Sequence, residues 1–575
     1  MNGIRLATLF ALSAAALTTS CKSNQMKIER LPYPETPRGE VVDNYFGTEV
    51  ADPYRWLEDD NSEATAAWVE AENAVTQDYL RQIPYRDAIR ERLTELWNYP
   101  KQGSLSRHGD YYYYFYNDGL QNQSVLHRTG DPAAEGEVFL DPNSLSDDGT
   151  VALADLSFSE DGRYLAYAAA ASGSDWVEIR VMDTRTGELT QDRINWVKFS
   201  GAIWAPDSEG FYYSAYDAPE KGVFSSQNQF QKVYYHKLGT KQEADRLVYR
   251  DDAHPLRYNN AWPSEDGRWL FVIASEGTSG TEILYRPASG GRFSVLLAGF
   301  AHDYAPVDCI NDQLYVMTND GASNYRLARI DLNAPAGLQD VIAENAENLL
   351  TDVSPAGGYL MATYLEDAQS KVYQYNYDGT LVREVELPAI GTASGFGAKR
   401  EATDLYYVLS NFTSPATVYN YDLETGRSFL YKAPQVNFDP DRFVTEQVFY
   451  TSKDGTQVPM FIVHRKDLKL DGKNPCYLYA YGGFQINLTP GFNPSAILLA
   501  EQGGIYCVAN LRGGSEYGEQ WHRDGMLDKK QNVFDDFIAA AEYLIEKKYT
   551  SSEKLAIAGA VSYTHLRAHE TGAYL

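Results

Sequence analysis

The sequence is poor in cysteine and in positive charge, and it has no long uninterrupted hydrophobic run. Only 4 of its 575 residues are cysteine, none in a CxxC pair, so a disulfide framework or a cysteine-based metal site is excluded. Besides Cys21 they are Cys309, Cys476 and Cys507, for which buried structural thiols are expected. The 50 lysines and arginines face 79 acidic residues, which leaves a net charge of -29. A nucleic-acid-binding protein is therefore not expected, because phosphate contacts need a basic face.

Residues 1–20 are typical of an export signal. Arg5 supplies a short basic region, and the apolar run Leu6–Leu17 is too short to cross a bilayer. Thr18-Thr19-Ser20-Cys21 resembles a bacterial lipoprotein cleavage box, although Thr18 stands where that box usually has Leu. Two outcomes are open: lipidation of Cys21, which would anchor the protein to a membrane, or simple cleavage, which would release a soluble protein. Either way we expect an exported, periplasmic protein.

The residues that follow predict a tether and two helices. Residues 22–45 are polar and contain three prolines, which favour an extended segment. Apolar residues at helical spacing then predict a helix over Ser62–Leu80, with Asn61 or Ser62 as its N-cap, and a second over Tyr85–Trp97. We assign residues 21–104 to this tether and to helices that pack on the C-terminal domain.

Between residues 105 and 440 the pattern changes to short alternating runs that recur. A turn followed by an aromatic-rich strand appears seven times, at intervals of 45 to 59 residues. The turns begin at Gly109, Asp161, Asp207, Asp266, Asn311, Gly357 and Thr403. Repeats of this length built from short strands are typical of a β-propeller, with one four-stranded blade per repeat. A two-sheet sandwich is the alternative, but seven near-even repeats favour a seven-bladed β-propeller over residues 105–440.

After residue 440 the pattern predicts a different domain. Gln447–His464 is typical of a hairpin, and two nearly continuous apolar runs, 476–481 and 505–510, suit strands buried on both faces. An amphipathic helix over Val533–Lys547 precedes another buried strand that ends at Gly559. Strand, helix, strand indicates an α/β domain with a parallel sheet, which we place at residues 441–559.

The end of that last strand is where an α/β-hydrolase carries its nucleophile elbow, G-x-S-x-G. Gly559 supplies the first glycine, but Val561 stands where the serine belongs. Ser562 is one place out of register, and Tyr563 would resist the strained turn that the elbow demands. Ser562 is therefore not expected to be a nucleophile.

Several segments resemble the prolyl oligopeptidases, serine peptidases in which a propeller covers an α/β-hydrolase domain. The resemblance runs from about residue 30 to Gly559. The segments that carry it are Val50–Asp59, Asn117–Gln123, Gly173–Trp176, Tyr481-Gly482-Gly483-Phe484, Asn510–Gly518 and Gln531–Phe537. The resemblance implies a mixed fold, a seven-bladed β-propeller plus an α/β-hydrolase domain that is incomplete here. It also implies that Tyr481 donates to the oxyanion and that Phe484 lines the substrate pocket, although ordinary core packing is an equal alternative for Phe484.

The family pattern stops at Gly559, where the family would continue Gly-Ser-x-Gly-Gly and supply Asp and His much later. We interpret residues 560–575 as a non-family tail, foreign to the reading frame, although a divergent natural end is an alternative. His565 and His569 in this tail are spaced for zinc on a helix. A metalloprotease would need Glu directly after the first His, so a foreign tail is the better interpretation.

These observations predict a fragment of a serine endopeptidase that cleaves after proline in short peptides. In the complete site a Ser would attack, a His would act as base and an Asp would orient the His. Without them the chain is predicted to be inactive. The alternatives are a relative with another cleavage preference, such as after basic residues, and a catalytically dead peptide-binding propeller protein. We expect a monomer whose partners are short proline-containing peptides, with no cofactor, metal or nucleic acid.

Overall fold

The computed structural model describes residues 31–59, 61–219 and 228–559. They belong to two compact units, one that ends at Arg86 and one that begins at Asp87. Several predictions concern residues outside the described ranges, namely the signal peptide, Cys21 and the tail with Ser562, His565 and His569. The three other cysteines are free and buried, as expected.

The first unit contains a hairpin and one long helix. Its elements are β1 (Val42–Tyr45), β2 (Thr48–Ala51), the 3-10 helix η1 (Arg55–Glu58) and α1 (Glu63–Arg81). The predicted helix is confirmed, and Ser62 is its N-cap, because the Ser62 hydroxyl accepts a hydrogen bond from the Thr65 N–H at 3.1 Å.

The second half of the predicted tether makes specific contacts with the residues that follow it. The indole N–H of Trp68 donates to the Thr36 hydroxyl at 3.0 Å, and that of Trp56 donates to the Pro37 carbonyl at 2.9 Å. Residues 42–45 then form strand β1. The prolines predicted extended backbone, but they carried no information on these two indole partners 19 and 32 residues away.

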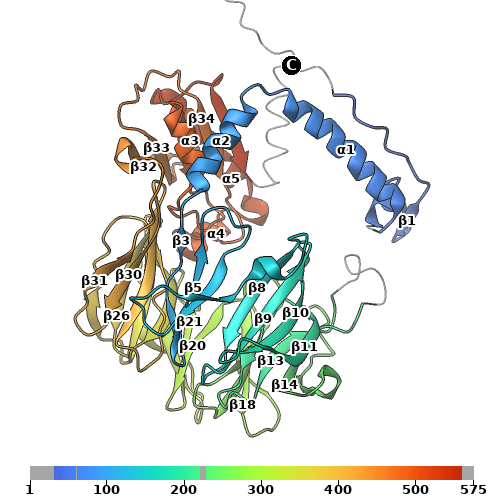
Figure 1. Cartoon of the computed structure of the whole chain (residues 1–575), viewed down its shortest axis with the longest axis vertical. Helices are drawn as coiled ribbons and strands as arrows, with labels where there is room; N and C mark the ends of the chain where they lie inside the picture. The colour runs from blue at the N-terminus through green and yellow to red at the C-terminus, as the bar shows by residue number, and fades with distance from the viewer. Residues whose placement is uncertain (1–30, 60, 220–227, 560–575) are drawn as a thin grey trace, which may run out of the picture. The chain divides into compact units, whose positions relative to one another are not determined.

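Within the described part of the second unit, seven antiparallel blades lie between Lys101 and Lys432, which confirms the predicted propeller (Figure 1). Blades 1 to 3 are β3–β7 (Lys101–Gln102, Ser106–His108, Tyr111–Asn117, Val125–Thr129, Glu137–Leu140), β8–β11 (Val151–Phe158, Tyr164–Ala171, Trp176–Asp183, Leu189–Lys198) and β12–β15 (Ile203–Trp204, Gly210–Ala215, Lys232–Lys237, Arg246–Tyr249). Blades 4 and 5 are β16–β19 (Tyr258–Pro263, Trp269–Ser275, Thr281–Pro287, Ser294–Leu297) and β20–β23 (Tyr304–Ile310, Gln313–Thr318, Arg326–Asp331, Gln339–Ile342). Blades 6 and 7 are β24–β27 (Leu349–Ala356, Tyr359–Glu366, Gln369–Tyr375, Leu381–Glu384) and β28–β31 (Thr392–Ser394, Asp404–Asn411, Ser414–Asp422, Ser428–Lys432).

Each predicted turn leads into the second main strand of a blade, from β5 in blade 1 to β29 in blade 7. In six of the seven turns a residue takes a left-handed backbone, as at Gly162 (φ 69°) and Asn311 (φ 51°). This conformation explains why Gly, Asn and Asp recur there. The aromatic residues of the following strands pack between blades; Phe211, Phe271 and Tyr407, for example, are fully buried. The repeat in the sequence is therefore a repeat of turn geometry and of inter-blade packing.

Among the described strands, blades 1 and 7 share none. Every strand of blade 1 comes from residues 101–140 and every strand of blade 7 from residues 392–432, so no strand of one joins the sheet of the other. Blades 2 and 3, in contrast, are joined into one sheet, because β11 pairs with β13 at Val197 and Ala215.

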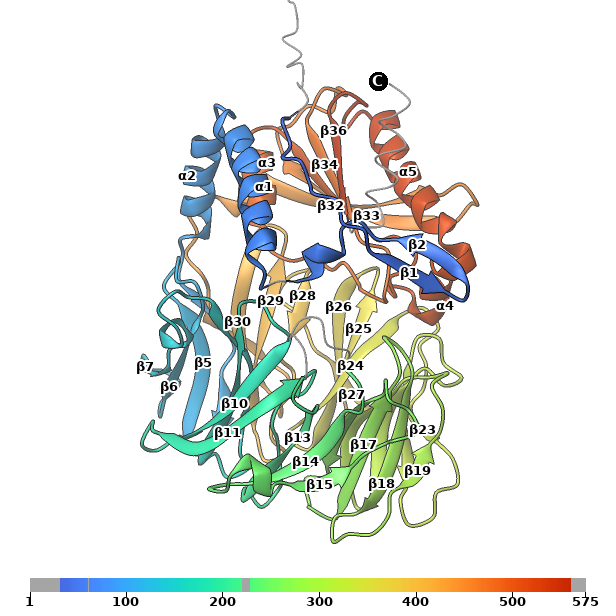
Figure 2. The same cartoon turned by 90° about the vertical axis from the view of Figure 1, so that its right-hand side faces the viewer.

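The chain after blade 7 forms a mixed five-stranded sheet in the order β32-β33-β35-β34-β36 (Figure 2). The strands are β32 (Phe443–Thr451), β33 (Gln457–Arg465), β34 (Cys476–Ala480), β35 (Ile505–Ala509) and β36 (Leu555–Gly559). β34, β35 and β36 are parallel, as their continuous apolar sequences predicted, and β32 and β33 form the predicted hairpin. This part is the α/β-hydrolase portion.

Helices cover this sheet. They are α2 (Arg86–Trp97), α3 (Pro494–Glu501), α4 (Gly518–Arg523) and α5 (Gln531–Glu546), with the 3-10 turns η2 (Pro142–Ser144), η3 (Gln242–Ala244), η4 (Pro440–Arg442) and η5 (Leu527–Lys529) elsewhere in this unit. α5 buries Val533, Phe537 and Leu544 against the core of β33, β34 and β35. Leu96 of α2 packs with Ile497 of α3. The carboxyl ends of β34 and β35 are thereby held on a rigid, packed base.

A buried ionic cluster ties blade 2 to blade 3. His236 on β14 has no exposed surface, and its two ring nitrogens lie 2.8 Å from an Asp192 oxygen and 2.7 Å from an Asp245 oxygen. Both carboxylates accept, so the imidazole donates from both nitrogens and is positively charged. Burial opposes this charge, but the hydrogen bonds that His236 donates to Asp192 and Asp245 outweigh it and raise the pKa of His236 to about 9.

This cluster predicts a loss of stability at alkaline pH. Because the folded pKa lies above the ordinary 6.5, the contribution is complete below pH 6.5 and is lost as pH rises to about 9. We expect the free energy of unfolding to fall by about 3 kcal/mol over this window, measured by urea denaturation. In the variant His236→Gln, this part of the pH dependence should disappear; an unchanged slope would contradict the charged state.

Candidate active site

Two loops follow the parallel strands β34 and β35 at the same edge of the sheet. The first, called here the Tyr481 loop, comprises residues 481–488, and the second, the Arg512 loop, comprises residues 510–518. The carboxyl ends of parallel strands meet at one edge, where α/β proteins place their ligands. Both loops belong to segments on which the family resemblance rests.

The backbones of the two loops touch. Gly513 has φ 95°, and a Cβ atom there would lie 2.8 Å from the Gly482 carbonyl oxygen, so only glycine fits. The Gln485 N–H donates to the Gly513 carbonyl at 3.1 Å, and the Ser515 hydroxyl donates to the Gln485 carbonyl at 3.0 Å. The Arg512 loop therefore supports the Tyr481 loop along its length.

Tyr481 and Phe484 lie on this supported loop but in different surroundings. Tyr481 directly follows β34 and is half-buried. Behind it, the Lys530 ammonium donates to the Gly482 carbonyl at 2.8 Å, and burial lowers the pKa of Lys530. Phe484 has φ 53° and is 66% exposed, so core packing does not account for it. Its substrate contact stays a prediction, as does the oxyanion role of Tyr481.

The base of the Arg512 loop is anchored by a buried ion pair. Arg512 Nη2 donates to Asp536 Oδ1 at 2.6 Å, while Arg512 Nε and the Arg512 N–H donate to Oδ2 at 3.0 and 3.1 Å. Asp536, on α5, has no exposed surface. The more exposed Asp454 is a second partner, and its hydrogen bond from Arg512 lowers the pKa of Asp454 to about 2.

The far end of the Arg512 loop contacts the propeller. The Tyr517 hydroxyl donates to the Asp367 carboxylate at 2.9 Å, next to β25, and the Glu519 N–H donates to the Ser323 carbonyl at 2.8 Å, before β22. Gly518 is pressed so closely there that a Cβ atom would lie 2.0 Å from the Asn324 side-chain oxygen. One loop thus joins the hydrolase sheet to blades 5 and 6.

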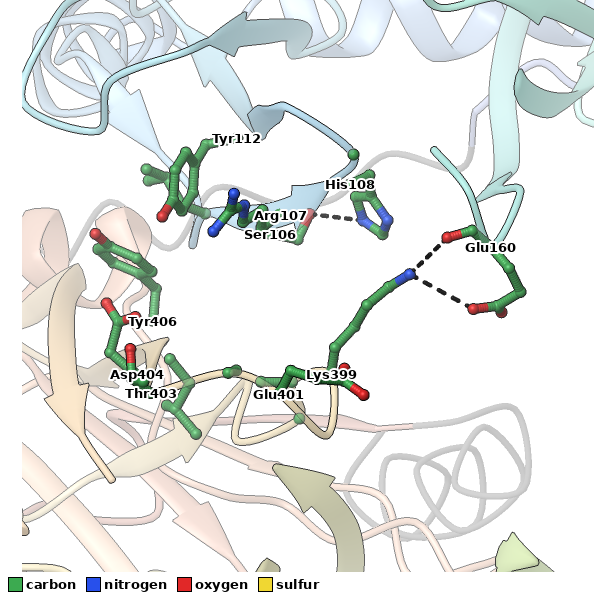
Figure 3. A pocket seen from close by; sticks show the side chains of 16 residues that line it. Ser106, Arg107, His108, Tyr112, Glu160, Lys399, Glu401, Thr403, Asp404 and Tyr406 are labelled. Atoms are coloured by element: carbon green, nitrogen blue, oxygen red, sulfur yellow. Dashed lines mark hydrogen bonds and ion pairs between the residues drawn. The ribbon is translucent and has the colours of Figure 1, made fainter. Parts of the chain in front are cut away.

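A cavity of about 680 Å³ lies elsewhere, at the seam between blades 1 and 7 (Figure 3). Lys399 of blade 7 spans it and donates to the Glu160 carbonyl of blade 2 at 2.8 Å. A ring nitrogen of His108 lies 3.2 Å from the Ser106 hydroxyl, which is the distance expected between a catalytic base and its serine nucleophile. However, His108 stacks on Phe158 at 4.0 Å, and burial lowers the pKa of His108 to about 4. So weak a base is poorly suited to activating a serine.

Sequence reasoning missed the polar contacts that hold the two loops. Asn510, Arg512 and Glu516 lie in a segment that was assigned no roles, yet all three are almost completely buried. The available signal was the run Asn-Leu-Arg-Gly-Gly-Ser-Glu directly after a buried strand, since polar residues in such a place must find partners. Among the described residues, no group of three or more His, Cys, Asp or Glu is arranged to hold a metal ion. Nor is any helix in these ranges long and apolar enough to cross a membrane.

A seven-bladed propeller combined with an α/β-hydrolase portion defines a class of propeller-bearing hydrolases. Two family profiles match the chain: "Prolyl oligopeptidase, N-terminal beta-propeller domain" over residues 34–434, and "Prolyl oligopeptidase family" over residues 490–563. The chain belongs to the prolyl oligopeptidase family of serine peptidases. The second match extends four residues beyond Gly559, where we had placed the end of the family pattern.

Relatives and solved structures agree. The chain is 45% identical to a prolyl endopeptidase of Elizabethkingia meningoseptica over 96% of its own length and 78% of the relative's. It is 35% identical to a dual function macrocyclase-peptidase of Galerina marginata, covering 92% of this chain and 78% of the other. A structure from an analysis of two prolyl endopeptidases that concerns inter-domain dynamics superposes with a TM-score of 0.86 at 39% identity. The match covers 92% of this chain and 78% of the chain in that structure.

Proposed function

We propose that this protein derives from an exported endopeptidase that hydrolyses the bond after proline in short peptides. The observation that carries the proposal is the 45% identity, over 96% of the chain, to a protein named prolyl endopeptidase. The supported Tyr481 loop at the carboxyl edge of the parallel sheet adds a site at which an oxyanion could be bound.

In this proposal Tyr481 and Phe484 act on the substrate. The Tyr481 hydroxyl donates a hydrogen bond to the oxygen that becomes negative when the peptide carbonyl is attacked. Gly513 and Lys530, which hold the Gly482 carbonyl region from two sides, keep that hydroxyl in place before the reaction. A donor fixed in advance needs no reorganisation as charge develops. Phe484, exposed on the same loop, offers an apolar surface to the bound peptide.

The propeller supports a preference for short peptides. Tyr517 of the Arg512 loop is bound to Asp367 of the propeller, and Glu519 directly after the loop is bound to Ser323, so the propeller covers this edge of the hydrolase sheet. A cavity of about 460 Å³ beside this contact is lined by Asp303 and Asn319 of the propeller and by Glu519 and His522 after the loop. A space of this size suits a few peptide residues and excludes a folded protein.

The second candidate function is peptide binding without turnover. It is favoured by Ala560-Val561-Ser562-Tyr563, which do not match the Gly-Ser-x-Gly-Gly that the family carries at this place. We propose that the 575-residue chain itself binds peptide but does not cleave it, and that residues 560–575 are foreign to the frame. Re-determining the source DNA beyond the Gly559 codon tests this: a Gly-Ser-x-Gly-Gly continuation supports the peptidase, whereas residues 560–575 followed by a stop codon support the binding protein.

Reporter peptides separate the remaining alternatives. Chromogenic substrates with Pro-Xaa and Arg-Xaa bonds should be compared on the protein from the re-determined gene. We expect cleavage of the Pro-Xaa reporter only, and faster cleavage of short peptides than of the same bond in a folded protein. Preferential cleavage after arginine would point to the relative with another specificity. Peptide binding by any version of the protein, with no turnover, would support the second candidate.

We propose an export signal at residues 1–20, with Cys21 as a lipidation site. Labelling with a radioactive fatty acid in a bacterial host tests it, with Cys21→Ala as the matched variant. Label on the native protein alone indicates a lipoprotein, whereas an unlabelled protein in the periplasmic fraction indicates simple cleavage.

A further inference from the structure

Glu516 is buried where the Tyr481 loop meets the Arg512 loop. Its side chain is 2% exposed, and its Oε1 atom accepts the Leu488 N–H at 3.0 Å and the Asn510 side-chain NH2 at 3.1 Å. The Asn510 NH2 also donates to the Leu488 carbonyl at 2.7 Å. Both backbone groups of Leu488, the last residue of the Tyr481 loop, are thus held by side chains of the Arg512 loop.

The second carboxyl oxygen, Oε2, has no hydrogen-bond partner, and neither has the Oδ1 atom of Asn510. A Cβ atom at Gly514 would lie 2.3 Å from Oε2 and 2.9 Å from the Ile486 carbonyl oxygen. Oε2 therefore lies in a narrow space beside the Gly514 backbone. An ionised carboxylate would leave it buried without a donor, which is costly. A proton on the carboxyl removes this buried charge.

The electrostatic surroundings agree with a neutral carboxyl. Burial raises the pKa of Glu516 to about 7, against the opposing hydrogen bonds from the Leu488 N–H and Asn510. The neighbouring titratable group is Tyr517, whose hydroxyl donates a hydrogen bond to Asp367. Burial raises the pKa of Tyr517, so this residue stays neutral. The nearby residues of the Tyr481 loop that bind the Arg512 loop, Gln485 and Asn487, carry no charge.

We propose that Glu516 is a positioning residue that, as a neutral acid, holds the Tyr481 loop on the Arg512 loop and so fixes the direction of the Tyr481 hydroxyl. The function of this contact rests on the proposed role of Tyr481, but its existence does not. When Glu516 loses its proton, a negative charge is buried on a carboxylate whose Oε2 atom has no hydrogen-bond donor, and the Tyr481 loop loosens.

Hydrogen exchange of peptides covering residues 481–488 tests the proposal in the whole chain. Rates are corrected for the intrinsic pH dependence of exchange and compared at about pH 6 and about pH 8.5, on either side of the pKa. In the native protein we expect protection at the lower pH that falls about tenfold at the higher pH. Glu516→Gln keeps a neutral side chain with a donor, so residues 481–488 should stay protected at both pH values. In Glu516→Ala these residues should lose protection at both pH values.

A matched control and a second readout keep the test decisive. Glu542→Gln removes one negative charge from the exposed face of α5 and should behave like the native protein. The infrared band of a protonated carboxyl, present in the native protein at about pH 6 and lost with a midpoint near pH 7, should be missing from Glu516→Gln. This difference can be measured even if the alanine variant fails to fold.

The proposal is overturned if that band is absent at the lower pH, or if Glu516→Gln loses protection with pH as the native protein does. Neither measurement needs turnover. Loss of the Glu516 contact and failure of the proposed peptidase function would therefore be recognised as separate results.

Discussion

Replacing Asp536 by alanine should lower the free energy of unfolding by about 3–5 kcal/mol. Asp536 has no exposed surface and accepts four hydrogen bonds, three from Arg512 and one from the Ser452 hydroxyl at 2.6 Å. The alanine variant leaves the guanidinium of Arg512, itself 4% exposed, without its main counter-charge. A buried charge that has lost its partner is among the costliest defects in a protein interior.

Asp454 offers the matched control for this prediction. It contacts the same guanidinium, but its side chain is 46% exposed. Water can replace much of the interaction that Asp454→Ala removes, so the free energy of unfolding of this variant should fall by no more than about 1 kcal/mol. Urea denaturation of both variants gives the comparison. Equal losses in the free energy of unfolding would show that burial of the Arg512–Asp536 pair does not govern its contribution to stability.

The double variant Arg512→Leu with Asp536→Leu separates the pair from its surroundings. Apolar replacements remove the unpaired charge, so the double variant should be more stable than Asp536→Ala. The Arg512 N–H would still lose its acceptor at Asp536 Oδ2. Peptides from the Arg512 loop should therefore exchange faster in the double variant, even where global stability is recovered.

The features that the sequence predicted well depend on local pattern. The turns at Asp161, Asp207 and Asn311 could be found because Gly, Asn and Asp tolerate the backbone that a tight turn needs. The parallel strands β34 and β35 could be found because strands buried on both faces are apolar throughout. Counting such local signals was enough to predict seven blades and the domain that follows them.

The site depends on partners far apart in the chain, which no local pattern reveals. Glu516 binds Leu488, 28 residues earlier, and Arg512 binds Asp536, 24 residues later. The family resemblance pointed to Tyr481 and Phe484 but could not show that glycine at 513 and 514 leaves room for the second loop. It likewise left the surroundings of Phe484 open, and the structure places this ring 66% in solvent.

Replacing Tyr481 by phenylalanine should reduce kcat by about 10²–10³-fold, with little change in KM, in the peptidase proposed above. In the proposed role, the hydroxyl stabilises the charge that develops on the attacked carbonyl, whereas the bound peptide in its ground state gains little from it. Phenylalanine retains the ring and therefore the packing of the loop. The measurement is the steady-state hydrolysis of a Pro-Xaa reporter peptide.

Tyr477→Phe is the matched control, because it removes a hydroxyl four residues earlier, on β34, the strand that leads into the Tyr481 loop. The Tyr477 ring stacks on Tyr506 with centroids 6.0 Å apart, a contact that phenylalanine preserves. This variant should keep its kcat. A Tyr481→Phe variant that loses less than about tenfold in kcat, or that loses activity through KM, would assign Tyr481 to binding. The oxyanion would then need another donor, and the close support of the Tyr481 loop by Gly513 and Glu516 would serve substrate recognition instead.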